Sequence, residues 1–205
     1  MNPPEPTKGE LTRERIQNAA HNLFLRQGYA ATSMRQIAAA SDLTVGGIYA
    51  HYTNKEAIWE DVFVRFHPFH QVLPILVAAK GETAAEAIRA AAYELVGGMI
   101  RSEDLLNLTF IEIVEFDGRH FSRIFREAFP QLLEMSRRLQ AMQGDMRDIP
   151  PPVLARSFIG LFFSYFLTEA LLQPEIKRFY PPDTLDRFVD IYLYGVLAGS
   201  GPERR

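Results

Sequence analysis

The chain of 205 residues contains no cysteine, which excludes disulfide bonds, thiolate metal sites and thiol redox chemistry. A reducing cytoplasm is the compartment that fits this absence. The first ten residues lack the basic start and apolar stretch of a secretory signal, and they predict a frayed tail. The most apolar run, residues 158–167, falls short of the ~20 residues that a membrane span needs. We therefore expect a buried helix there and no association with a membrane.

The sequence also lacks the signatures of common catalytic sites. It has no Gly-x-Ser-x-Gly element and no glycine-rich phosphate loop. His67 and His70 have a spacing that suits two metal ligands, but polar residues around a proline-ended helix explain them better. We predict a protein without catalytic residues, metal or cofactor.

Alternating apolar and polar runs of the kind that form strands are missing as well, whereas apolar residues recur at helical spacing along most of the chain. The pattern predicts an all-α fold of about nine helices. Pro130 should interrupt the helix expected over residues 117–143. Capping boxes begin two others, at Ser33 with Gln36 and at Thr83 with Glu86.

Charge divides the chain into two parts. Between Lys8 and Lys55 there are six basic and three acidic residues, a net charge of +3, so the remainder carries −6 of the overall −3. We place a domain boundary near Phe66, between a basic domain (residues 1–66, ordered from about residue 10) and a larger acidic domain (residues 67–205).

Two short helices in the basic domain, starting near Ser33 and Thr44, have the spacing of a helix-turn-helix. The second contains Gly46 and Gly47, each of which costs a helix about 1 kcal/mol relative to alanine. Glycines facing a DNA groove would let the helix sink deeply into it. The pair therefore favours close approach to DNA.

The segment TSMRQIAAASDLTVGGIYAHYTNKEAIW, residues 32–59, resembles the DNA-binding segment of the tetracycline-repressor (TetR) family of bacterial transcription regulators. The resemblance covers about residues 12–62, and Tyr52 replaces the commoner phenylalanine. It implies an N-terminal three-helix DNA-binding domain followed by a helical domain for ligand binding and dimerisation. It implies base contacts by Arg35, Thr44, Val45 and Gly46, and phosphate contacts by Thr32, Ser33, Tyr49, His51 and Lys55.

Two helices near the C-terminus, over residues 153–172 and 184–198, are apolar over most of their surface. Such helices are either central to a core or shared with another subunit. The resemblance implies the second, a homodimer that binds a near-palindromic operator, with these interface residues: Phe158, Phe162, Tyr165, Phe188, Tyr192 and Val196.

The aromatic residues of the middle helices belong by default to the core. The resemblance adds a small-molecule pocket in this region, and its phenylalanines favour an apolar or aromatic effector. The predicted lining residues are Phe66, Tyr93, Phe110, Phe121, Phe125 and Phe162.

These observations together predict a sequence-specific DNA-binding regulator, most simply a ligand-released homodimeric repressor in the cytoplasm. Two other classes remain open. A helical binding protein would show no preference among DNA sequences, and a helical enzyme using His67, His70 or His120 would turn over a bound compound.

Overall fold

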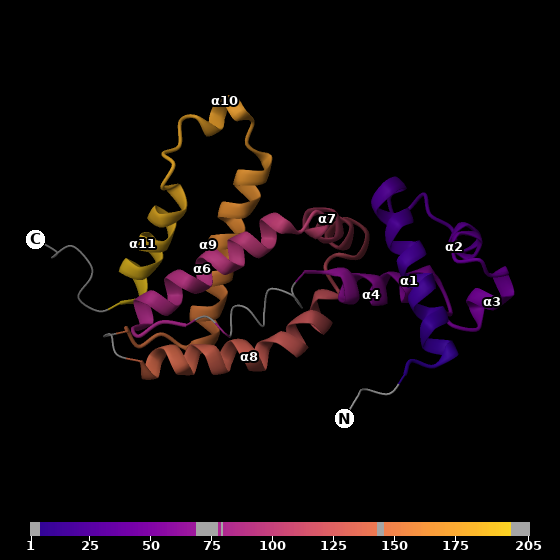
Figure 1. Cartoon of the computed structure of the whole chain (residues 1–205), viewed down its shortest axis with the longest axis horizontal. Helices are drawn as coiled ribbons and strands as arrows, with labels where there is room; N and C mark the ends of the chain where they lie inside the picture. Colours follow the sequence, from indigo (N-terminus) through magenta and orange to yellow (C-terminus); the bar gives the residue numbers. More distant parts are fainter. Residues whose placement is uncertain (1–4, 69–77, 79, 143–145, 198–205) are drawn as a thin grey trace, which may run out of the picture. The chain divides into compact units, whose positions relative to one another are not determined.

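The computed structural model describes residues 5–68, 78, 80–142 and 146–197. Its described residues form ten helices and no strand, apart from one isolated bridge between Met146 and Leu197. This confirms the all-α prediction. The chain divides into two compact units, and Figure 1 shows the helices of each.

The N-terminal unit comprises Met1–His67 and Glu103–Ile124. Its helices are α1 (Lys8–Gln27), α2 (Met34–Ala40), α3 (Val45–Tyr49), α4 (Lys55–Phe66), α7 (Leu105–Phe116) and the first residues of α8 (Phe121–Ala141). The division differs from the predicted boundary near Phe66, because residues 103–124 group with the segment that ends at His67. As a functional boundary, position 66 remains a prediction.

Local sequence explains how these helices begin and end. Thr7 and Ser33 each form a capping box, with Glu10 and Gln36, and so start α1 and α2. Gly28 ends α1 at a φ of +84°, a conformation that glycine adopts without steric cost.

An aromatic cluster fills the core of the N-terminal unit. Trp59 of α4 is fully buried and stacks on Phe116 of α7, with ring centroids 5.7 Å apart. Phe24 of α1 and Phe63 of α4 pack against the same indole at 5.4 and 5.8 Å. Helix α7 is therefore part of this core.

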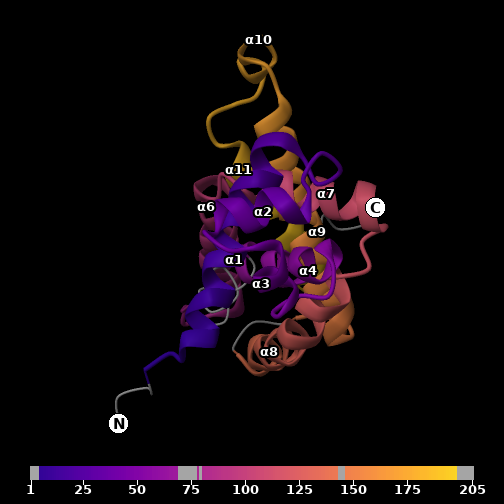
Figure 2. The ribbon, with the colours of Figure 1, turned by 90° about the vertical axis from the view of Figure 1, so that its right-hand side faces the viewer.

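The C-terminal unit comprises Pro68–Ser102 and Phe125–Arg205. It contains α6 (Ala84–Arg101), the larger part of α8, α9 (Pro151–Leu171), α10 (Pro174–Lys177) and α11 (Thr184–Val196). Figures 1 and 2 both show α9 and α11 side by side, joined through α10. Helix α10 was not predicted. It lies in the proline-containing connector between α9 and α11.

The interruption expected at Pro130 is absent, because α8 is a single helix that contains this residue. A proline removes one intrahelical donor and its ring crowds the carbonyl four residues earlier, and α8 continues through Pro130 despite both effects. By length and composition alone, helix α9 could cross a membrane. In its most apolar stretch, 28% of the residues are buried within the protein. Its contacts with α6 and α11 make it a central helix of the C-terminal unit.

Candidate nucleic-acid interface

Helices α2 and α3 are joined by a short turn whose geometry comes from local hydrogen bonds. The Ser41 hydroxyl donates to the Ile37 carbonyl at 2.8 Å, and Asp42 adopts a left-handed conformation with φ of +55°. The Thr44 hydroxyl then accepts from the amide of Gly47 at 3.0 Å and caps α3. The two helices thus form the predicted helix-turn-helix.

The packing of the unit does not require glycine at position 46. A Cβ atom added to Gly46 would meet only the Thr44 hydroxyl, at 4.0 Å, which is an ordinary contact. At Gly47 the same atom would lie 3.3 Å from that hydroxyl and 3.7 Å from Leu43 Cβ, a tighter fit. Gly46 makes α3 less stable than alanine would, and packing inside the protein does not explain its presence.

The residues predicted to read bases all lie on the exposed side of the helix-turn-helix. Val45 is 43% exposed, and Arg35, Thr44 and Gly46 are exposed as well. Ile48 on the opposite side of α3 is fully buried and fixes the helix to the core. The first turn of α3 and Arg35 on α2 are therefore both exposed to solvent.

The residues predicted to contact phosphate are in three different environments. Ser33 and Tyr49 are exposed, and His51 is partly exposed. Thr32 is 2% exposed, and its hydroxyl donates to the Gly28 carbonyl at 2.8 Å. The Lys55 ammonium donates to two backbone carbonyl groups of its own chain. Thr32 and Lys55 thus have internal partners that the sequence did not reveal.

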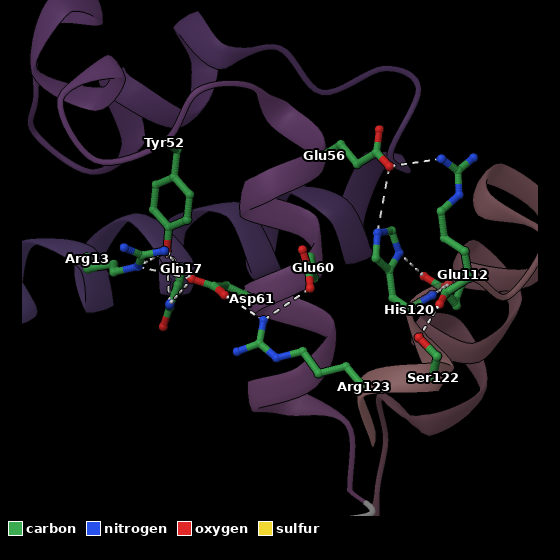
Figure 3. A network of polar contacts seen from close by, with 11 residues as sticks. Arg13, Gln17, Tyr52, Glu56, Glu60, Asp61, Glu112, His120, Ser122 and Arg123 are labelled. Carbon is green, nitrogen blue, oxygen red and sulfur yellow. Dashed lines mark hydrogen bonds and ion pairs between the residues drawn. The ribbon is translucent and has the colours of Figure 1, made fainter. Parts of the chain in front are cut away.

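A cluster around Asp61 ties α4 to three other segments of the unit (Figure 3). Its carboxylate accepts from Arg13 at 2.8 Å, from the Tyr52 hydroxyl at 3.0 Å and from Arg123 at 3.2 Å. Burial raises the pKa of the Asp61 carboxyl, but the bonds from Arg13 and Tyr52 outweigh it and hold the pKa below its usual range. Burial also raises the pKa of Tyr52 to about 12. These bonds therefore fix the position of Tyr52, which lies in the turn between α3 and α4.

A second cluster, centred on Glu112, joins α4 to α7 and to the start of α8 (Figure 3). The Glu112 carboxylate is fully buried and accepts from Trp59 Nε1 at 2.7 Å and from the backbone amide of His120 at 2.8 Å. His120 Nδ1 lies 3.0 Å from the same carboxylate, and its Nε2 lies 3.7 Å from Glu56. Sequence reasoning missed both clusters. For the second cluster, the available signal was Glu112, a lone glutamate on the apolar face of the helix LLNLTFIEIVEF.

The six residues predicted to line a ligand pocket belong to both units. Phe66 stacks on His21, and Phe121 packs on Phe63, each inside the N-terminal unit. Phe110, on α7 of that unit, is 46% exposed. In the C-terminal unit Phe162 is fully buried, whereas Tyr93 and Phe125 are exposed. In neither unit do the described contacts place these residues around a common cavity. The pocket therefore remains a prediction.

The residues predicted at a dimer interface are mostly buried within one chain. Phe158, Phe162, Tyr192 and Val196 are each at most 6% exposed, and the rings of Phe158 and Tyr192 lie 5.4 Å apart. Tyr165 and Phe188 are partly exposed and pack on one another. The solvent-facing sides of α9 and α11 carry other residues: Gly160, Ser164, Ile191, Tyr194 and Gly195.

Histidines and carboxylates form no cluster of three that could hold a metal among the residues that the structure describes. His67 is buried and lies beside the rings of Phe63 and Phe121. His70, the other half of the predicted pair, lies outside the described residues.

Comparison with known proteins finds relatives of the segment that contains α2 and α3. Residues 16–62 match the family model described as bacterial regulatory proteins, tetR family. The HTH-type transcriptional regulator UidR of Escherichia coli K12 is 32% identical over 59 residues. This alignment spans 29% of the present chain and 30% of UidR, so the likeness to UidR covers one segment of each protein.

Solved structures extend the likeness of fold to nearly the whole chain. A putative TetR-family regulator from Mesorhizobium loti aligns over 94% of this chain and 100% of its own, with a TM-score of 0.72 and 20% identity. SmeT, the repressor of the Stenotrophomonas maltophilia multidrug efflux pump SmeDEF, aligns over 97% of both chains, with a TM-score of 0.64 and 22% identity. A complex of SmeT with triclosan aligns with a TM-score of 0.60.

Proposed function

Because the chain belongs to the tetR family of bacterial regulatory proteins, we propose that it is a homodimeric, effector-released regulator that binds a specific operator. The observation that carries this proposal is the exposed face of α2 and α3. On it, Arg35, Thr44 and Val45 are exposed together with Gly46, a glycine that the protein's own packing does not require. That family consists of DNA-binding regulators and not of enzymes.

Base reading falls to the start of α3 and to Arg35. An α-helix fits the major groove of B-DNA, and the absence of a side chain at Gly46 allows closer approach. Arg35 can form a bidentate contact with guanine, worth about 1–3 kcal/mol of discrimination, and Val45 can contact a thymine methyl group. Thr44 adds a hydroxyl at the same edge.

Phosphate contacts come from exposed groups around this helix. The hydroxyl of Tyr49 and the ring of His51 have the accessibility that such contacts need, and the exposed hydroxyl of Ser33 would exchange its bond to Gln36 for one to phosphate. Contacts of this kind fix the orientation of the protein on the duplex without reading its sequence.

Dimerisation uses the solvent-facing sides of α9 and α11. The glycines at positions 160 and 195 and the serine at 164 permit close packing of helices, and Ile191 and Tyr194 supply apolar area. A two-fold dimer would place two recognition helices about 34–36 Å apart, which matches a near-palindromic operator with half-sites one DNA turn apart.

The effector is an apolar or aromatic small molecule, and the regulator is a cytoplasmic repressor. Support for the ligand class comes from the phenylalanine content of the chain and from the SmeT–triclosan complex. Among the described residues of the C-terminal unit, a cavity of about 10 Å³ lies between α6, α8, α9 and α11, room for about one water. Release of DNA requires that the effector bind the DNA-free conformation more tightly than the DNA-bound one.

The decisive experiment selects duplexes from a random pool with the purified protein and measures affinity for the winner against scrambled DNA. We expect a palindromic sequence bound at least about 10³-fold more tightly. Arg35→Ala should weaken preference at one base pair per half-site. Arg137→Ala, an exposed arginine of the C-terminal unit, is the matched control. A pool without enrichment, or an Arg35→Ala variant with unchanged preference, would contradict the proposal.

A further inference from the structure

Lys55, the first residue of α4, directs its charge into the protein. Its Nζ donates to the carbonyl oxygens of Tyr29 and Thr32, each at 2.7 Å, and lies 4.0 Å from the centroid of the Tyr29 ring. The side chain is partly buried. Two of the three ammonium donors are thus engaged, and an aromatic face covers the same cation.

The segment that Lys55 holds is the turn between α1 and α2. Gly28 opens this turn with a positive φ, and the amide of Thr32 donates to the Tyr29 carbonyl at 3.1 Å. Ser33, the next residue, caps α2, and Arg35 follows within the first turn of that helix. The position of the turn therefore sets the position of the arginine that faces outward.

The contacts of the Lys55 ammonium favour the internal position, whereas burial works against it. Burial lowers the pKa of the Lys55 ammonium, and the Glu115 carboxylate acts in the opposite direction. Turning the side chain toward a phosphate would break both hydrogen bonds and the contact with the Tyr29 ring. It would also leave the Thr32 carbonyl without its lysine donor.

We propose that Lys55 is a positioning residue that holds the α1–α2 turn against the start of α4, and that it does not contact phosphate. The proposal rests on the proposed DNA-binding function, and it assigns to Lys55 a different role from the one the family resemblance implies. The stretch from Gly28 to Asn54 contains one lysine or arginine, Arg35. Without Lys55, the phosphate contacts proposed within this stretch come from Ser33, Tyr49 and His51.

Salt dependence separates the two roles. Each phosphate neutralised by a lysine or arginine contributes about −0.9 to the slope of log affinity against log salt concentration. Loss of a phosphate contact in both subunits of a dimer would reduce the slope by about 1.8. Loss of a positioning contact would weaken binding at every salt concentration and leave the slope unchanged.

The test compares wild type with Lys55→Met, which keeps an apolar stem over the Tyr29 ring and removes the charge. We expect a melting temperature lower by at least about 4 °C, operator affinity weaker by about tenfold and an unchanged salt slope. A slope reduced by about 1 or more overturns the proposal. So does a variant with wild-type melting temperature and affinity.

Lys55→Arg provides a second route if Lys55→Met does not fold. An arginine preserves the charge and serves well as a phosphate contact, but its planar fork does not reproduce the lysine contacts with the two carbonyls. We expect Lys55→Arg to lose both thermal stability and affinity, and full retention of both would overturn the proposal. If the wild type binds no DNA, the proposed function fails, and the melting temperatures still test whether Lys55 holds the turn.

Discussion

Both units have apolar cores, but the polar contacts between their helices differ. In the N-terminal unit, buried or partly buried carboxylates such as Glu112 and Asp61 bond to groups from several segments. In the C-terminal unit, α6, α9 and α11 pack through alanines and aromatic rings, and ion pairs such as Arg89 with Asp186 lie at partly exposed positions. Hydrogen bonds are directional, so they fix the relative placement of helices more closely than apolar packing does. The first unit thus suits the proposed DNA-binding surface, and the second suits the proposed binding of an effector.

The largest effect that would test this contrast is expected at Phe162 in the C-terminal unit. Its ring is fully buried and lies 4.8 Å from Phe158, so Phe162→Ala should lower the free energy of unfolding by about 3–5 kcal/mol. Urea unfolding measures the loss. Phe179→Ala, at a residue that is 73% exposed, should change stability by no more than about 0.5 kcal/mol. Equal effects of the two variants would mean that the core of this unit lies elsewhere.

A slightly smaller loss is expected at Glu112 in the N-terminal unit. Glu112→Ala leaves the donors of Trp59 and His120 unpaired in the core, and should cost about 3 kcal/mol. Glu112→Gln keeps one acceptor oxygen and should lose less. Glu115→Ala, on the exposed side of the same helix, is the matched control, with an expected change within about 0.5 kcal/mol. If Glu112→Ala unfolds at the wild-type urea concentration, the buried carboxylate does not hold α4 to α7.

Acid should weaken the N-terminal unit through Asp61. Because the folded-state pKa of this carboxyl is lowered, its contribution to stability is present above its unfolded value of about 4 and is lost as pH falls through the folded value. Asp61→Asn should therefore be less stable than wild type at neutral pH, and the gap should narrow below about pH 4. Urea midpoints across this range give the result, with Asp148→Asn in the C-terminal unit as control. A gap that stays constant with pH would refute the assignment.

The smallest change in stability, and the sharpest for function, is expected at Gly46. Gly46→Ala adds to a helix a methyl group that meets only an ordinary contact with the Thr44 hydroxyl, so it should stabilise the protein by about 0.5–1 kcal/mol. The same methyl group should weaken operator binding, because it faces the proposed groove. Gly9→Ala, with a similarly open environment in α1, should stabilise the protein without loss of affinity. Unchanged affinity in Gly46→Ala would remove the argument for close approach at this position.

Local signals located most of the fold but only part of the interface. The capping boxes at Ser33 and Thr83 were predicted and are present, because each depends on residues a few positions apart. Arg35, Val45 and Gly46, for which the family resemblance implies base contacts, are exposed, and the contacts themselves stay a prediction. Lys55 differs, since its carbonyl partners lie 26 and 23 residues earlier in the chain.

The sequence by itself determined an all-helical chain, a helix-turn-helix near its N-terminus and the residues that this motif turns outward. Periodicity, caps and turn residues act over a few positions, and a single chain displays them directly. Only the tertiary structure decided that α7 belongs with the N-terminal unit, that Phe158 and Phe162 are buried within one chain, and that Lys55 points inward. These outcomes depend on which distant donors, acceptors and apolar faces meet. That choice is made by packing and by the cost of leaving buried polar groups unpaired.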